Sequence, residues 1–258
     1  MAKSQDERPG AGGACAYVIY YGWLTDDAQG EPNAVARAIA AAGTSLLIAH
    51  LRTAAPAGHR NLSPQVLALM RAAGVQVFGY VATAYGRADA RVVADDVAKN
   101  LDAGLDGILF DEADSLVLPV KLAYYRRLGE TVRSRGKSII LNTGVSRCGE
   151  HIMQIADRLM VEHEWRALHS DSPWARTYPP ERFMGVSSNE ERAMGYRVDK
   201  ARAIADARLA WEAGVGWHTA TTRYAEFPMW FDDYVRAGKT EADTMYSAAP
   251  PARESRDC

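Results

Sequence analysis

Cysteine is scarce in this sequence. The three that occur, Cys15, Cys148 and Cys258, lie far apart along the chain. An odd number at such spacing excludes a disulfide framework and the paired C-x-x-C ligands of a zinc site. The histidines at positions 163, 169 and 218 match no common ligand spacing either. We therefore expect neither a metal nor another cofactor.

A marked excess of one charge and long apolar runs are also missing. The net charge is -2, which gives no indication of nucleic acid or an anionic membrane as a partner. No apolar run approaches the length that spans a membrane, and residues 1–13 are polar rather than the apolar segment of a signal peptide. We expect a cytoplasmic protein. The sequence carries no indication of its oligomeric state.

What the chain does contain is a regular alternation of short β-rich stretches with helical ones. Strands are expected at residues 16–21, 45–50, 75–82, 107–110, 138–142, 158–162, 182–186 and 216–220. Helices are expected at residues 31–42, 63–73, 90–103, 119–135, 149–156, 198–213 and 227–237. The segment after the sixth strand, with its two tryptophans and a proline pair, is expected to be a long polar loop.

This alternation predicts an α/β protein with a parallel sheet. Eight strands, seven of them followed by a helix, in a chain of 258 residues fit a single-domain (β/α)8 TIM barrel, for which roughly 250 residues is typical. The alternative is an open doubly wound sheet, but its G-x-G-x-x-G fingerprint is absent after the first strand. The barrel is expected over residues 15–237, with a disordered lead at 1–14 and a disordered tail at 238–258.

Two adjacent carboxylates, Asp111 and Glu112, follow the apolar run of the fourth strand. Carboxylates at the end of a buried strand are costly unless water, a partner or a substrate meets them. In an α/β barrel this end of the strands carries the chemistry, so we interpret the pair as part of an active site. Two other roles remain open: Asp111 could cap the next helix, and Glu112 could pair with an arginine at the rim.

The residues that directly follow the strands of a barrel gather on one face. Besides Asp111 and Glu112, the candidate acids are Glu162 and Glu164, of which one could be merely solvated. Candidate substrate-binding residues are Tyr20, His50, Tyr80, Thr83, Tyr85, Arg87, Asn142, Trp165 and His218. Paired carboxylates suit glycosidic cleavage, because one donates a proton and the other serves as nucleophile or base. Tyr80 and Tyr85 could instead be core or rim aromatics, and Asn142 a turn residue.

Two strings of this region resemble motifs of the spherulation-specific family 4 (spherulin-4). Gly79-Tyr80-Val81-Ala82-Thr83-Ala84-Tyr85-Gly86-Arg87 resembles its G-Y-V-x-T-x-Y-G-x-R, and Asp106-Gly107-Ile108-Leu109-Phe110-Asp111-Glu112 resembles its D-G-I-F-F-D-E. The likeness covers roughly residues 16–235, and Asn142-Thr143-Gly144 resembles the family's N-P-G turn with threonine in place of proline. Another departure is His50-Leu51-Arg52, where the family has an Asn-Pro loop.

The resemblance implies a (β/α)8 barrel related to microbial glycoside hydrolases that cut galactosamine-containing exopolysaccharides. It also implies that Asp111, Asn142 and an acid after the sixth strand form the active site. We therefore expect a metal-independent glycoside hydrolase whose substrate is a small saccharide containing an amino sugar of the galactosamine type. Asp111 and Glu162 or Glu164 would share the acid and the base or nucleophile roles, with Glu112 as a neighbouring like charge. Asn142, Tyr85 and His218 would orient the substrate.

Two alternatives from other classes remain at this point. The same barrel could catalyse a lyase or isomerase step on a small intracellular metabolite, with His50 and His218 as acid–base groups. It could also be an inactive barrel that only binds sugars. Fold alone does not separate these functions.

Overall fold

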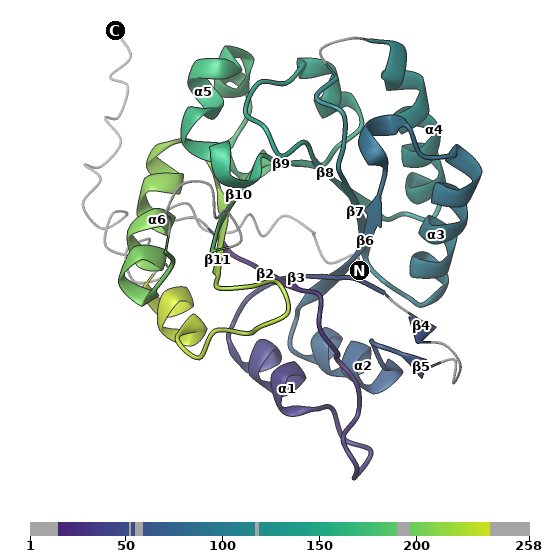
Figure 1. The fold of residues 1–258 in the computed structure, drawn as a ribbon, viewed down its shortest axis with the longest axis vertical. Coiled ribbons are helices and arrows are strands. Elements are labelled where there is room, and N and C mark those ends of the chain that lie inside the picture. The colour runs from purple at the N-terminus through teal and green to yellow at the C-terminus, as the bar shows by residue number, and fades with distance from the viewer. Residues whose placement is uncertain (1–14, 52, 55–58, 117–118, 190–196, 238–258) are drawn as a thin grey trace, which may run out of the picture.

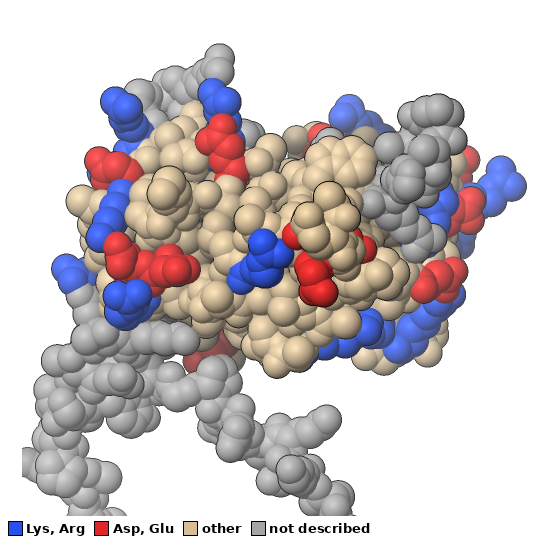
Figure 2. Space-filling view, turned by 90° about the horizontal axis from the view of Figure 1, so that it is seen from below, with Lys and Arg blue, Asp and Glu red and all other residues tan. Residues whose placement is uncertain are grey.

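The computed structural model describes residues 15–51, 53–54, 59–116, 119–189 and 197–237 (Figure 1). The lead expected at residues 1–14 and the tail expected at 238–258 lie outside the described residues. No helix in the described part of the chain is long and apolar enough to cross a membrane. On the face drawn in Figure 2, Lys and Arg are interspersed with Asp and Glu, and neither sign forms a continuous patch.

The described strands form one nine-stranded sheet, parallel throughout, and a small hairpin. The sheet contains β1 (Cys15–Ala16), β2 (Val18–Tyr20), β3 (Leu46–Ala49), β6 (Gln76–Ala82), β7 (Gly107–Asp111), β8 (Ser138–Asn142), β9 (Arg158–Met160), β10 (Phe183–Ser188) and β11 (Trp217–Thr221). β1 pairs with β11, whereas β2 pairs with β3. Only Tyr17 separates β1 from β2, so both are segments of one strand that joins the two ends of the sheet. The predicted (β/α)8 barrel is confirmed.

Helices surround the barrel (Figure 1). They are α1 (Ala34–Ala41), α2 (Pro64–Ala72), α3 (Ala90–Asp102), α4 (Leu122–Arg133), α5 (Leu168–Asp171) and α6 (Lys200–Glu212), with a further helical stretch at 231–237. Local signals in the sequence set their starts. Ser63, for example, accepts a hydrogen bond from the Val66 amide at 3.1 Å, and Pro64 occupies the first helical position, where its missing N–H is not needed.

The connections differ from expectation in three places. Residues 149–156 were expected to be a helix, but only the short 3-10 helix η3 (Glu150–Gln154) forms there. The expected polar loop after the sixth strand instead contains η4 (Glu162–Ala167), α5, η5 (Pro173–Thr177) and η6 (Pro180–Arg182). The hairpin of β4 (Thr53–Ala54) and β5 (His59–Arg60) lies in a segment expected to be a loop. Short elements with few periods leave little signal in a sequence.

The core is divided by the sheet. One cluster draws residues from every strand position, including Tyr17, Ile48, Leu109 and Ile140, and must therefore fill the barrel interior. Two other clusters lie between the sheet and the helices. Side chains alternate along each strand, with Ile108 and Phe110 packed outside and Leu109 inside. The same alternation directs Asp111, two positions after Leu109, to the inner side at the carboxyl end of the barrel.

Candidate active site

Asn142, the last residue of β8, connects two carboxylates. Its side-chain Nδ2 donates to Asp111 Oδ1 at 2.6 Å and to Glu162 Oε1 at 2.6 Å. The two carboxylate oxygens are therefore separated by no more than twice that distance. Asp111 ends the neighbouring strand β7, and Glu162 follows the next strand, β9. Three adjacent strands thus bring an amide and two acids together on the carboxyl-end face.

The turn after β8 fixes the orientation of the Asn142 amide. The main-chain N–H of Gly144 donates to Asn142 Oδ1 at 2.9 Å, so the NH2 group must face the carboxylates. Gly144 has a φ of +68°, which a residue without a Cβ adopts readily. Thr143 donates its main-chain N–H to Met160 O at 3.1 Å. A proline at this position, as in the family motif, would lack that hydrogen bond.

The two candidate acids after β9 have different surroundings. Glu162 contacts Asn142, and it adopts a φ of +39°, which is uncommon for a residue with a side chain. Glu164 instead accepts hydrogen bonds from Ser146 N at 2.8 Å and Ser146 Oγ at 3.0 Å. Of the two, Glu162 is therefore the one brought into the site.

Asp111 has a second donor in Tyr80. Burial raises the pKa of Tyr80 above its ordinary value, and the charge and hydrogen bond of Asp111 raise it further. Tyr21 behaves similarly: burial raises its pKa, and the charge of Asp111 raises it further. Both phenols therefore stay protonated near neutral pH. Protonated phenols can donate hydrogen bonds to a carboxylate or to a substrate oxygen.

Aromatic rings line the neighbouring part of the inner face. Tyr21 packs against Tyr80 at 5.2 Å and Tyr224 at 5.4 Å between ring centroids, and His50 lies 4.7 Å from Tyr80. These residues come from strand ends that are far apart in sequence. His50 and Tyr80 were among the candidates, whereas Tyr21 and Tyr224 were not selected. Alternation places Tyr21 on the same side of the strand as Ile19, and the structure shows that this side faces the barrel interior.

The turn after β6 places the remaining candidates in different environments. Thr83 is fully buried, and its hydroxyl lies 3.0 Å from Asp111 O and 2.8 Å from Glu112 O. Tyr85 has 46% of its surface exposed, with the Arg87 guanidinium 5.6 Å from its ring centroid. Glu112 is exposed, and its carboxylate has no hydrogen-bond or ion-pair partner among the described residues. The arginine pairing considered for Glu112 is not observed in that part of the chain.

The role of Asp111 as a helix cap is likewise not observed. The next helix, α4, begins at Leu122 after the cap residue Lys121.

Three of the predicted substrate-binding residues lie away from Asp111, Asn142 and Glu162. Tyr20 packs between the sheet and the helices, with its ring beside Gly22. Trp165 is fully buried in the outer core and donates to Val186 O at 3.3 Å. His218 is fully buried, with its ring nitrogens 3.1 Å from Ser187 Oγ and 2.9 Å from Tyr234 Oη. All three belong to the layer outside the barrel, so their expected contact with substrate does not fit their placement.

The His218 site belongs to a buried polar network. Ser187 Oγ donates to Asp206 Oδ2 at 2.8 Å, and Asp206 pairs with Arg166 at 2.5 Å and Arg202 at 3.0 Å. Burial lowers the pKa of His218 to about 3, although the charge of Asp206 opposes this shift. Arg166 lies in η4, the same segment that carries Glu162. The network therefore anchors η4 against α6.

Metal ligation has no geometric basis in the described residues. No group of three or more His, Cys, Asp or Glu side chains is placed there to hold an ion. Cys148 is buried, which raises the pKa of its thiol to about 11. That thiol is protonated near neutral pH and is a poor nucleophile or metal ligand.

Comparisons with known proteins identify the family and agree with the barrel fold. A family model described as spherulation-specific family 4 matches residues 53–237. The fold is similar to a GH18 chitinase from Pseudoalteromonas aurantia, with a TM-score of 0.58 and 12% identity over 88% of this chain and 99% of that one. It is also similar to a chitinase from Chromobacterium violaceum ATCC 12472, with a TM-score of 0.57 and 12% identity over 88% of this chain and 99% of that one.

The Bacillus megaterium QM B1551 spore cortex-lytic enzyme SleL has a TM-score of 0.56 and 9% identity, over 90% of this chain and 75% of that one. At such identities these likenesses show the fold alone, which is a (β/α)8 barrel. No curated protein matches the chain.

Proposed function

The chain belongs to the spherulation-specific family 4, and from that premise we propose that it is a glycoside hydrolase that cleaves an amino-sugar glycoside without a metal. The observation that carries the proposal is the amide of Asn142, which holds Asp111 and Glu162 at 2.6 Å each. Most glycoside hydrolases use two carboxyl groups that flank the scissile bond. The chitinase and cortex-lytic enzyme with the same fold support this class of reaction.

Asp111 is placed to act as the nucleophile. Hydrogen-bond donors from Asn142 and Tyr80 converge on its carboxylate and hold its orientation. Glu162 then supplies the proton to the leaving oxygen. Asn142 holds the carboxyl groups of Asp111 and Glu162 at a fixed spacing. The tyrosines of the inner face contact the sugar. Galactosamine-type sugars are the proposed substrates because the central motifs resemble those of the family.

The spacing of the pair favours retention of configuration. Carboxyl groups about 5–5.5 Å apart are typical of retaining enzymes, whereas roughly 6.5–9.5 Å leaves room for the water of an inverting one. Asp111 would attack the anomeric carbon while the glycosidic oxygen leaves with the Glu162 proton. Water would then break the resulting glycosyl ester, with Glu162 removing its proton. An NMR assay of the first-formed anomer tests this point, and release of the inverted anomer would contradict it.

Nothing in the geometry favours the alternative chemistry with two histidines. His218 is buried in the outer layer, where Ser187 and Tyr234 occupy its ring nitrogens. It lies apart from His50, which is on the inner face. An acid–base pair of these residues would have no common substrate position.

A mass-spectrometric screen tests the proposed function. Purified protein and the Asp111→Asn variant would be incubated with galactosamine oligosaccharides, other amino-sugar glycosides and a metabolite extract. We expect cleavage of a glycoside by the wild type alone, with both proteins equally folded by circular dichroism. Substantial residual cleavage by the variant would overturn the role of Asp111. A change confined to a non-glycosidic metabolite would overturn the assignment as a glycosidase.

A further inference from the structure

Unfavourable backbone conformations are concentrated at the carboxyl ends of three strands. Among the described residues, five other than glycine have a positive φ: Ala84, Tyr85, Glu112, Leu116 and Glu162. They follow β6, β7 and β9, on the face that carries Asp111. Residues with a side chain adopt this conformation at an energetic cost, and such costs are typical of binding and catalytic sites.

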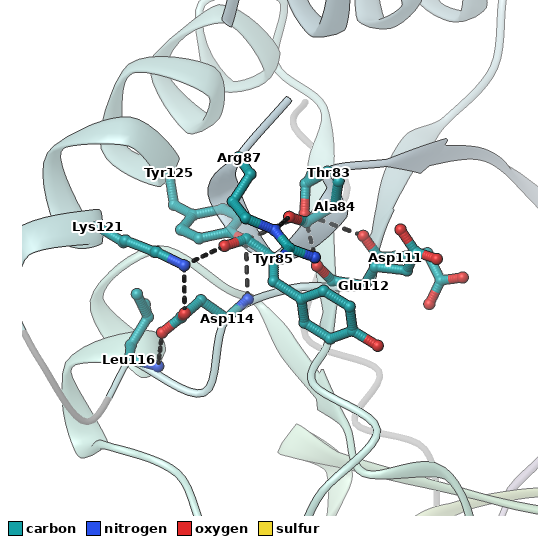
Figure 3. A network of polar contacts seen from close by, with 10 residues as sticks. All are labelled: Thr83, Ala84, Tyr85, Arg87, Asp111, Glu112, Asp114, Leu116, Lys121 and Tyr125. Atoms are coloured by element: carbon teal, nitrogen blue, oxygen red, sulfur yellow. Dashed lines mark hydrogen bonds and ion pairs between the residues drawn. The ribbon is translucent and has the colours of Figure 1, made fainter. Parts of the chain in front are cut away.

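The turn after β6 is the most extreme case. Ala84, Tyr85 and Gly86 are consecutive and have φ values of 47°, 58° and 69°. The main chain of Tyr85 is fixed on both sides. Its N–H donates to Glu112 O at 2.6 Å, and its carbonyl accepts a hydrogen bond from the Lys121 ammonium (Figure 3). The turn is thereby attached to the loop that follows β7.

The same attachments hold the main chain of Asp111. Lys121 forms an ion pair with Asp114 at 2.8 Å. Tyr125 Oη lies 3.0 Å from Thr83 Oγ1 and accepts a hydrogen bond from Asp114 N at 2.8 Å. Thr83 N donates to Asp111 O at 2.9 Å. Together, these contacts fix the main chain of Tyr85 relative to the main chain of Asp111.

The ring of Tyr85 is the part of this turn that remains in solvent. It is 46% exposed, and burial of an apolar surface does not account for its place in a strained turn. Figure 3 shows the ring extending on the same side of the turn as the carboxylates of Asp111 and Glu112. The Arg87 guanidinium lies 5.6 Å from the ring centroid, where it can donate to hydroxyl groups. An exposed aromatic face on a fixed main chain suits contact with the C–H face of a sugar.

We propose that Tyr85 forms an outer subsite that binds a sugar unit next to the one being cleaved. The proposal rests on the proposed function of Asp111 and Glu162, and it makes the preferred substrate an oligosaccharide rather than a single glycoside. The strained turn fixes the main chain that carries the ring before substrate arrives, so little backbone freedom is lost on binding. Tyr85 acts here as a binding residue and contributes nothing to proton transfer.

The substitution Tyr85→Gly tests the subsite without endangering the fold. Glycine adopts a φ of 58° more readily than tyrosine, and this relief of strain offsets the greater entropy of glycine in the unfolded chain, so the variant is expected to be about as stable as the wild type. On oligosaccharides long enough to reach the subsite, kcat/KM should fall roughly tenfold, the size of one aromatic contact. On the shortest substrate that is cleaved, the loss should be much smaller. Tyr85→Phe restores the aromatic face and should recover most of the activity on long substrates.

Two results would overturn the proposal that Tyr85 forms a subsite. One is an unchanged kcat/KM of Tyr85→Gly on long substrates, and the other is an equal loss of kcat/KM on short and long substrates. A binding experiment separates this outcome from failure of the proposed function. Calorimetric titration of galactosamine and chitin oligosaccharides of increasing length would compare Asp111→Asn with the double variant Asp111→Asn/Tyr85→Gly. Length-dependent binding lost in the double variant supports the subsite even if the wild type cleaves no glycoside. Equal binding by both variants refutes it.

Discussion

At the scale of single residues, Asn142 performs a task that neither carboxylate could perform alone. Two carboxylates brought close together repel each other, and each also loses hydration as it leaves bulk water. The Asn142 amide offers both of its N–H groups to them while Gly144 N holds its oxygen. The side chain therefore supplies a donor to each acid and fixes the distance between them.

Asn142→Asp is expected to be severely harmful to activity. The change preserves shape but replaces the shared donor with a third carboxylate, which must be protonated or repel its neighbours. We expect kcat to fall by at least ~10²-fold, comparable to the loss of a preorganised hydrogen-bond donor in other enzymes. Steady-state kinetics on the substrate identified by the screen checks this, with thermal unfolding as a control for folding. Near wild-type kcat in a folded variant would refute the bridging role.

The two acids after β9 offer a matched comparison. Glu162→Gln removes the proposed proton donor and should lower kcat by roughly 10²–10⁴-fold, the usual contribution of general acid catalysis. Glu164→Gln alters a side chain that bonds to Ser146, so kcat should change less than about twofold. Parallel kinetics of the two variants checks the assignment. Equal effects, or a larger effect at Glu164, would reverse it.

At the scale of elements, the ends of β6, β7 and β8 are joined by hydrogen bonds beyond the regular ladder. Thr83 N donates to Asp111 O at 2.9 Å, and Ala113 N donates to Asn142 O at 2.7 Å. These bonds lie where the parallel sheet ends and the loops begin. They hold the site on strand ends rather than on mobile loop tips, which keeps its geometry rigid.

Thr83→Val is expected to weaken this junction. Valine has nearly the same shape, but it lacks the hydroxyl that serves Asp111 O, Glu112 O and Tyr125 Oη inside the protein. Leaving buried polar groups unsatisfied costs about 1–3 kcal/mol. Denaturant unfolding measures this loss. The control is Thr131→Val on α4, whose hydroxyl bonds at the surface and whose loss should cost less than about 0.5 kcal/mol. Equal stability of both variants would contradict the role of the Thr83 hydroxyl in joining the ends of β6 and β7.

At the scale of the whole molecule, the barrel is stabilised from outside by a buried ionic and polar network. Asp206 is fully buried, and its partners come from η4, β10 and α6. His218 on β11 extends the network to Tyr234. Breaking a buried ion pair by removing one partner is strongly destabilising. The network therefore couples β10 and β11 to η4, α6 and the helical stretch at 231–237.

The buried, neutral His218 should make the protein less stable in acid. Its pKa in the folded protein is about 3, below the ordinary value of 6.5, so the unfolded chain binds the additional proton. The contribution of His218 is fully present above pH 6.5 and decreases as the pH falls from 6.5 toward 3, by up to about 1.4 kcal/mol per pH unit.

His218→Gln checks this, because glutamine can still bond to Ser187 and Tyr234 but does not titrate. Denaturant unfolding at several pH values should show a shallower acid dependence in the variant than in the wild type. The same acid dependence in both proteins would show that His218 is not responsible.

The sequence alone determined the barrel and two members of the site. The alternation of apolar strands and capped helices predicted the eight strand positions, because each element carries its own periodicity and end signals. Asp111 and Asn142 could be identified as well. Each directly follows a buried apolar run, and the carboxyl ends of neighbouring parallel strands lie side by side.

Only the tertiary structure decided which side of the sheet each side chain occupies. Both faces of a barrel strand are buried, so an apolar strand gives no indication of which alternate residues face inward. This is why Tyr20 was selected and its inward-facing neighbour Tyr21 was not, and why His218 was expected in the site. The choice between Glu162 and Glu164 was also beyond the sequence. The left-handed conformation of Glu162 interrupts the alternation after β9, and it depends on packing that only the folded chain provides.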